Sequence, residues 1–109
     1  MQSAAVARDK IFYALADPSR RAIFESLARG EAAVKDLTGR FDISQPAVSQ
    51  HLAALKDAGL VRGRKEGRLV YYRVEPRGMK PLIDWIAHYR VFWTEHLDRL
   101  ERLLEQMDE

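Results

Sequence analysis

The chain has 109 residues with 47% apolar side chains, enough for one domain with one hydrophobic core. It contains no cysteine, which excludes disulfides, thiolate metal sites and a cysteine nucleophile and is compatible with a reducing cytosol. The net charge of +2 is uneven, because residues 1–77 hold 14 Lys and Arg against 9 Asp and Glu and residues 78–109 hold 4 against 7, which suggests one surface for a polyanion and a second contact surface.

The first segment predicts a helix over residues 4–16, because apolar side chains recur there at helical spacing. The members of this stripe are Val6, Ile11, Phe12 and Leu15. The segment lacks the basic-then-apolar pattern of a signal peptide, and no apolar run in the chain approaches membrane-spanning length. We therefore expect a cytoplasmic protein without a membrane partner.

Asp17 and Pro18 predict the start of a second helix over residues 18–29, with Asp17 as its cap and Pro18 in its first position. Gly30 ends this helix, whose inward residues are Ile23, Phe24 and Leu27. Arg20 and Arg21 lie in the first turn, where positive charge opposes the helix dipole. This position predicts that they face either a partner such as phosphate or a nearby acid.

Residues 34–58 have the pattern of a helix-turn-helix, with a short helix over 34–40, a four-residue turn and a capped second helix. Asp42 stands in the turn where Gly is frequent, and Asp tolerates the left-handed conformation better than most residues. The expected inner seam consists of Leu37, Phe41, Ile43, Val48 and Leu52. Many unrelated helix pairs have the same pattern, so the identification of a helix-turn-helix also depends on the segments that flank it.

The second helix of this motif has clear boundaries, because Ser44 can cap it, Pro46 suits its first turn and Gly59 can end it. Its outer face is small and neutral, whereas ordinary exposed faces are rich in Lys and Glu. Such a face can contact base edges in a DNA major groove; a solvated helix of low charge is the alternative. The candidate DNA-binding residues are Ser44, Gln45, Pro46, Ala47, Ser49, Gln50 and His51, of which His51 is either buried or a phosphate contact.

Residues 60–75 predict a β-hairpin, because β-branched and aromatic residues flank Glu66-Gly67. Four cations lie around its tip with only Glu66 opposing them: Arg62, Arg64, Lys65 and Arg68. Directly after a helix-turn-helix, such a hairpin is a wing, and neutralisation by a nucleic-acid backbone would relieve the repulsion between its cations. A solvated hairpin blunted by basic edge residues is the alternative.

Residues 79–107 predict a long helix whose apolar side chains follow a 4-3-4 spacing and extend to a second face. A domain of 109 residues cannot cover both faces of such a helix alone. We therefore expect a homodimer in which this helix packs on its copy and on the first helix; a helix folded back on its own core is the alternative. The expected dimerisation residues are Phe12, Leu82, Trp85, Ile86, Tyr89, Phe92, Trp93, Leu97, Leu100 and Leu104.

Four segments together resemble the ArsR/SmtB-type winged-helix repressors: LADPSRR at 15–21, ISQPAVSQHL at 43–52, LKDAGLV at 55–61 and EGRLVY at 66–71. With the terminal helices they cover nearly the whole chain in the family's order. The resemblance implies a mainly α fold of about five helices with a two-stranded wing, dimeric through its terminal helices. It also implies a bacterial or archaeal homodimeric transcription factor, usually a repressor, that binds an inverted-repeat operator.

Many members of that family sense metals, so both of their known sites need inspection. The thiolate site would fall on Ala33 and Lys35, which do not resemble soft-metal ligands. On the last helix the candidates are Asp84, His88, Glu95 and His96, whose spacing does not match the family pattern. We predict no metal and no cofactor, and a metal site shared across the dimer is the alternative.

The prediction for the whole chain is one winged-helix domain over 1–109 that binds double-stranded DNA sequence-specifically. Gln45, Ser49 and Gln50 would read base edges, and the wing cations would hold the backbone. A winged-helix module that binds protein is the rival from another class. An enzyme is disfavoured, since no Ser/His/Asp arrangement, phosphate-cradling Gly loop or paired carboxylates stand out.

Overall fold

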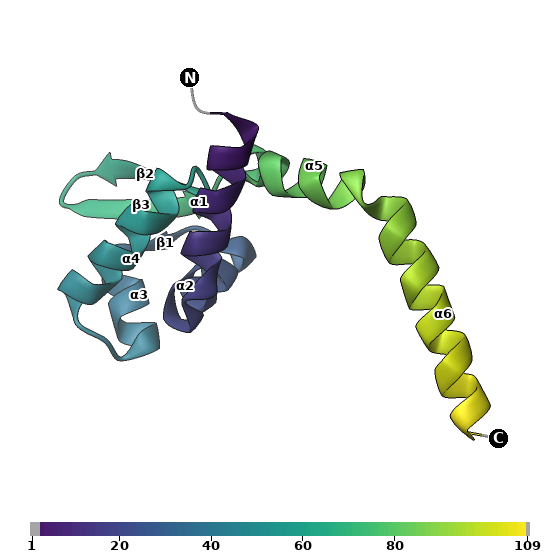
Figure 1. Ribbon diagram of the computed structural model, residues 1–109. Coiled ribbons are helices and arrows are strands. Elements are labelled where there is room, and N and C mark those ends of the chain that lie inside the picture. Colours follow the sequence, from purple (N-terminus) through teal and green to yellow (C-terminus); the bar gives the residue numbers. More distant parts are fainter. Residues whose placement is uncertain (1–2, 109) are drawn as a thin grey trace.

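The fold begins with two helices joined at a single residue. In the computed structural model, which describes residues 3–108, α1 (Ala4–Ala16) is followed at Asp17 by α2 (Pro18–Arg29) (Figure 1). Asp17 Oδ1 accepts a hydrogen bond from the Arg20 N–H at 2.9 Å, and Pro18 occupies the first turn, where its missing donor leaves nothing unsatisfied. The predicted boundary between the two helices is confirmed.

The two arginines that follow this cap, Arg20 and Arg21, contact the carboxyl-terminal end of α1. Arg21 Nη1 donates to the Leu15 carbonyl oxygen at 2.9 Å, and the Arg20 guanidinium lies 5.4 Å from the centre of the Tyr13 ring. Positive charge is favourable at the carboxyl end of a helix, where carbonyl groups lack intrahelical partners. These contacts explain the two arginines without an ion pair among the described residues, and a contact with phosphate stays a prediction.

The helix-turn-helix is formed by α3 (Val34–Phe41) and α4 (Gln45–Asp57). Asp42 between them adopts the left-handed conformation at φ 50° and ψ 43°. Gly59 after α4 has φ +78°, as expected of a helix-ending glycine. The turn directs α4 across α3, and the expected seam lies inward, with Leu37, Val48 and Leu52 fully buried and Phe41 and Ile43 packed against them.

The wing is an antiparallel hairpin of β2 (Val61–Glu66) and β3 (Leu69–Val74), in which Arg64 lies opposite Tyr71. A further strand, β1 (Ala32–Ala33), pairs with β3 and gives the sheet order β1-β3-β2. This strand escaped prediction because two alanines carry no strand preference of their own. It ties the wing to the beginning of α3.

One core holds α1–α4 and the sheet together as a head. Its buried members come from each of these helices and from β1 and β2. They are Ile11, Ala14, Ile23, Leu27, Ala32, Leu37, Val48, Leu52, Leu55, Leu60 and Val61. Of the stripe expected on the first helix, Val6 and Phe12 stay outside this core.

After the wing, a short 3-10 turn, η1 (Pro76–Met79), leads into α5 (Lys80–His88) and α6 (Arg90–Asp108), which we call the arm. The single helix expected over 79–107 is wrong in its continuity, because the chain bends at Tyr89 (φ −103°, ψ 15°). The Tyr89 N–H donates to the Ile86 carbonyl, three residues back, at 3.1 Å. Neither Gly nor Pro stands at the bend, and the apolar stripe continues through it, so the sequence pattern does not reveal it.

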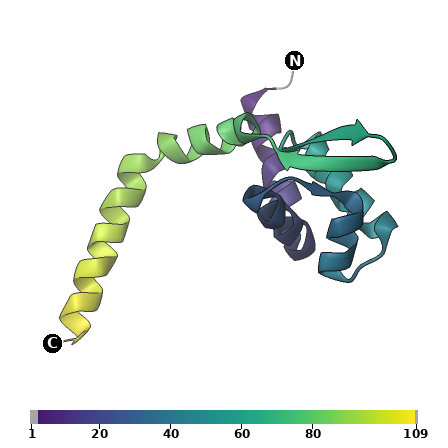
Figure 2. The same cartoon turned by 180° about the vertical axis from the view of Figure 1, so that it is seen from behind.

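The arm gives the molecule its elongated shape of 60 × 39 × 19 Å. α5 leaves the head beside α1, and α6 then stands clear of the head, as both views show (Figures 1 and 2). None of the described residues of α6 is buried. Among residues 3–108, no helix is both long and apolar enough to span a membrane.

Candidate nucleic-acid interface

The amino-terminal cap of α4 and its buried side together determine which of its side chains face solvent. Ser44 Oγ accepts a hydrogen bond from the Ala47 N–H at 3.2 Å, which fixes the first turn. Val48, Leu52 and Leu55 are buried, and their spacing turns the opposite side of the helix to solvent. Gln45, Pro46, Ser49 and Gln50 are exposed there, and Ala47 is half-buried at the edge.

A groove of about 250 Å³ runs between the beginning of α3, α4 and the wing. It brings the predicted residues Gln45 and Ser49 together with Arg68 of the hairpin. Its other lining residues are Val34, Lys35, Leu52, Leu69, Val70 and Tyr72. Sequence reasoning missed Lys35 as a member of this face; a cation in the first turn of α3, which the helix dipole disfavours, is the signal that could have shown it.

The four predicted wing cations have different partners. Arg64 donates to Glu66 Oε2 at 2.6 Å and to Glu31 Oε1 at 2.7 Å, and it lies over the Tyr71 ring. The bond to Glu66, then that to Glu31, raises the pKa of the Arg64 guanidinium. Arg64 therefore clamps the wing to the segment before β1.

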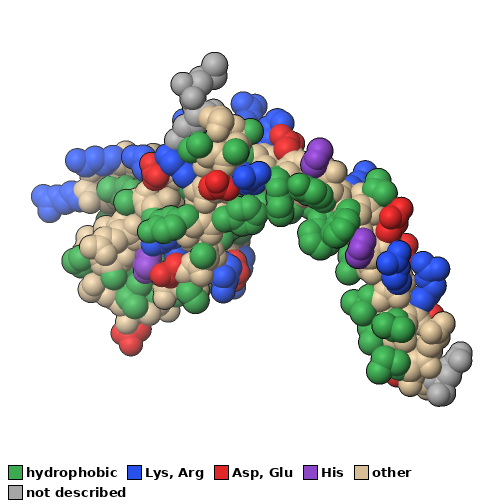
Figure 3. Space-filling view, in the orientation of Figure 1, with side chains coloured by type: hydrophobic (Ala, Val, Ile, Leu, Met, Phe, Trp, Pro, Cys, Tyr) green, Lys and Arg blue, Asp and Glu red, His purple; other side chains and the backbone are tan. Residues whose placement is uncertain are grey.

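Arg62 lies 3.6 Å from Glu75 Oε2. Within the part of the chain that the structure describes, Lys65 and Arg68 have no ion-pair partner. Lys and Arg side chains gather at the free end of the wing (Figure 3). The end of the wing therefore presents positive charge that the protein itself does not neutralise.

His51 occupies the inner edge of α4. It is half-buried, and its Nδ1 atom is shielded from solvent without a hydrogen-bond partner among the described residues. The hydrogen bond from the Arg20 N–H, with a smaller contribution from His51, lowers the pKa of the Asp17 carboxyl below its ordinary 3.8.

Asp17→Asn is expected to change stability little at neutral pH, because Asn caps a helix as well as Asp does. A carboxyl whose pKa is lowered by folding stabilises the fold above pH of about 4 and ceases to do so as the pH falls through the folded pKa. The variant should therefore lose less stability in acid than the wild type. Thermal melts from pH of about 7 down to 3 test this; parallel curves for the two proteins would contradict it.

The arm exposes the apolar side chains expected at a dimer contact. Ile86, Tyr89, Phe92, Trp93, Leu97, Leu100 and Leu104 are each 40–57% exposed, as is Phe12 of α1 at 43%. Trp85 is half-buried with its ring edge-on to Phe12, 5.4 Å between centres, and Leu82 packs on the chain's own core. Hydrophobic side chains line the side of the arm that is turned toward the head (Figure 3).

The residues weighed as metal ligands do not gather within one chain. No three His, Asp or Glu side chains among residues 3–108 form a group that could hold a metal ion. Asp84 accepts from Lys80 Nζ at 2.7 Å, and His96 Nδ1 lies 2.8 Å from the Phe92 carbonyl oxygen. His88 packs edge-on against Tyr89, and Glu95 is exposed.

A helix-turn-helix that exposes short polar side chains beside a basic hairpin defines a winged helix-turn-helix protein. Residues 17–62 match the family described as "Bacterial regulatory protein, arsR family". The chain belongs to this family of bacterial transcriptional regulators, as its resemblance to the ArsR/SmtB-type proteins predicts.

Two relatives and one solved structure show how far the similarity extends. The chain is 41% identical over 97 residues to the HTH-type transcriptional regulator Rv2034 of Mycobacterium tuberculosis, covering 89% of this chain and 88% of that protein. It is 31% identical over 81 residues to the transcriptional repressor SdpR of Bacillus subtilis, covering 74% and 90%. The crystal structure of the ArsR family transcriptional regulator RHA00566 superposes with a TM-score of 0.75 at 34% identity, covering 86% of this chain and 97% of that one.

Proposed function

We propose that the chain is a homodimeric repressor that binds an inverted-repeat operator in double-stranded DNA. It acts in the cytoplasm, where bacterial DNA lies. The groove that joins Gln45 and Ser49 of α4 to Arg68 of the wing carries this proposal, because one duplex can contact all three. The relative SdpR is a transcriptional repressor, which supports the direction of regulation. Residues 1–109 act as one winged-helix domain, by binding and not by catalysis.

Base reading falls to the exposed amino-terminal half of α4. Gln45, Ser49 and Gln50 hydrogen-bond base edges directly or through water, and Pro46 and Ala47 make apolar contacts. Ser44 fixes the helix end that approaches the duplex. His51, half-buried at the edge of α4, lies at the margin of this surface.

Phosphate binding falls mainly to the wing. Lys65 and Arg68 hold the backbone, joined by Lys35 at the groove. Arg62 and Arg64 add positive potential, but their carboxylate partners must share them with any phosphate. Since the chain has no cysteine, we propose that no thiolate metal site controls binding.

The arm supplies the twofold contact. Its exposed apolar face is larger than an isolated head can cover, and a second copy of the same face covers it most simply. Two recognition helices must then lie about one DNA turn apart, roughly 34–36 Å. An operator of two inverted half-sites follows from that symmetry.

Gln50→Ala tests the reading role. We expect its affinity for the operator, found by selection from random duplexes, to fall by about 1–3 kcal/mol, with little change on random DNA. Arg68→Ala, the matched control for backbone contact, should weaken both duplexes alike and reduce the salt slope by about one. Fluorescence anisotropy titrations at several salt concentrations measure both effects. An equal loss for Gln50→Ala on operator and random DNA would refute the assignment.

A further inference from the structure

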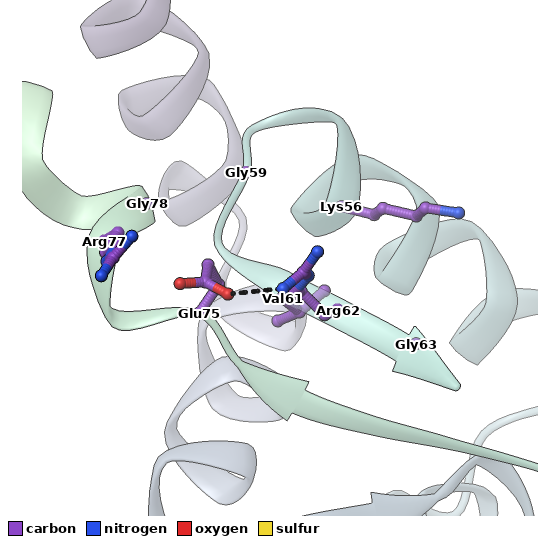
Figure 4. Close-up of a pocket in the computed structure, with 8 residues that line it drawn as sticks. All are labelled: Lys56, Gly59, Val61, Arg62, Gly63, Glu75, Arg77 and Gly78. Carbon is purple, nitrogen blue, oxygen red and sulfur yellow. Dashed lines mark ion pairs between the residues drawn. The ribbon is translucent and has the colours of Figure 1, made fainter.

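A second basic site lies at the joint between α4, the root of the wing and η1. A cleft of about 730 Å³ opens there, lined by Lys56, Gly59, Val61, Arg62, Gly63, Glu75, Arg77 and Gly78 (Figure 4). We call it the joint cleft. In Figure 4 the Arg62–Glu75 ion pair lies between Arg77 on one side and Lys56 on the other. Its charged side chains come from four separate elements or turns of the chain.

The charge of the joint cleft is unbalanced. Glu75 is the one carboxylate among its lining residues, and it pairs with Arg62 at 3.6 Å. Lys56 and Arg77 have no ion-pair partner within residues 3–108. Arg73 lies directly across the hairpin from Arg62, and like charges in that position destabilise a strand pair. A bound anion would relieve this repulsion.

The joint cleft is remote from the DNA-reading end of the head. Lys56 follows Gln45 by eleven residues, which is about 16 Å along α4. Arg62 precedes the wing end at Glu66 by four residues, about 13 Å along β2. A duplex held by the start of α4 and the tip of the wing therefore does not account for Lys56, and it meets Arg62 only through the positive potential of the wing.

We propose that the joint cleft binds a small phosphate-bearing molecule, such as a phosphate monoester or a pyrophosphate. Two arginine forks and a lysine suit an anion of more than one charge, and phosphate carries close to two charges at neutral pH. The cleft is about 730 Å³ and open to solvent, so a small anion can enter it without any rearrangement of the backbone. Lys56 and Arg77 are exposed on flexible stems and can turn toward a bound anion.

The position of the site predicts regulation. Gly78 touches the backbone of Gly59 in the cleft wall, so this wall joins the end of the reading helix to the start of the arm. An anion that draws Arg77 toward Arg62 changes the angle between the head and the arm, and with it the spacing of two reading helices. This coupling, unlike the binding itself, rests on the proposed homodimeric DNA-binding function.

Calorimetric titration of the full chain with pyrophosphate, at constant ionic strength, tests the binding. We expect one saturable site, weakened about tenfold or more by the double change Lys56→Gln, Arg77→Gln. The matched control, Lys65→Gln with Arg68→Gln, removes the same charge from the wing tip and should leave pyrophosphate binding unchanged. Glu75→Gln should strengthen it, since the opposing carboxylate is lost. Equal weakening by both double variants, or a signal that does not saturate, would overturn the proposal.

DNA titrations of the same variants separate this inference from the proposed function. Without pyrophosphate, the joint-cleft variant should bind operator and random duplexes like the wild type. If it weakens every duplex and lowers the salt slope, as the wing-tip variant is expected to do, the joint cleft is a DNA-backbone contact and the proposal fails. If the wild type binds pyrophosphate but no selected duplex, the proposed function fails while the anion site stands.

Discussion

The double change Leu97→Glu, Leu100→Glu is expected to yield a folded monomer of about 12.6 kDa that has lost operator binding. Both leucines are at least half exposed on α6 within one chain, so the head does not depend on them. In the proposed dimer they are covered by the partner's arm. Each unpaired carboxylate forced into that contact costs several kcal/mol, and a dimer would carry four of them.

Sedimentation equilibrium and operator titration measure the two consequences of this change. A monomer offers one half-site contact in place of two, so we expect operator affinity to fall by a factor of about 100 or more, while weak binding to random DNA persists. Arg102→Glu, on the charged side of α6, is the matched control and should remain dimeric. A Leu97→Glu, Leu100→Glu protein that keeps twice the monomer mass would show that this face does not pair.

The parts of the fold that depend on near neighbours were predictable from the sequence. The caps at Asp17 and Ser44 form within three residues, and the left-handed Asp42 is a local backbone preference. The outward face of α4 follows equally from its apolar period. These features depend on interactions that any short peptide of the same sequence could begin to make.

Features set by how separate elements meet, and the bend within the arm, were not predictable in this way. The Arg64–Glu31 ion pair spans 33 residues, and it exists because β1 brings that segment to the wing. Arg21 binds the end of α1 because the two helices turn back on one another at Asp17. The bend at Tyr89 interrupts a stripe that looks continuous along the sequence.

The candidate DNA-binding site likewise contains residues that the sequence predicts and residues that only the tertiary structure brings together. Gln45, Ser49, Gln50 and Arg68 follow from motif and charge, but Lys35 joins them only once α3 is placed against the wing. The joint cleft needs Arg62 and Arg77 to line the same cleft from either side of Glu75 (Figure 4), which no spacing in the sequence indicates. Tertiary packing thus decides which of the many Lys and Arg side chains in residues 1–77 share one surface.

Gly78→Ala is expected to destabilise the head more than any other glycine-to-alanine change at a position where φ is negative. A Cβ at Gly78 would lie 1.8 Å from the Gly59 carbonyl oxygen and 2.6 Å from its carbonyl carbon. Such atoms cannot approach closer than about 3 Å, so one backbone segment must move away from the other. The collision is with main chain, which has no rotamer to change.

The Gly59 segment is poorly able to yield. Its N–H donates to the Lys56 carbonyl at 2.9 Å, the Leu60 N–H donates to Leu55 at 3.0 Å, and the Glu75 N–H donates to Leu60 at 2.9 Å. Leu60 is fully buried as well. We expect a cost of about 3 kcal/mol, at the upper end for overpacking, and a fall in the melting temperature of roughly 10–20 °C at equal protein concentration.

Gly39→Ala is the control, because the same substitution is expected there to raise the stability of the protein rather than lower it. Gly39 lies inside α3, and a Cβ there would meet nothing within 4 Å. Alanine should therefore stabilise the helix by about 0.5–1 kcal/mol, the opposite direction for the same chemical change. Calorimetric melts of the two variants beside the wild type decide the matter. A Gly78→Ala protein that melts with the wild type would mean that the joint opens freely, and the head and arm would then not be coupled through Gly59 and Gly78.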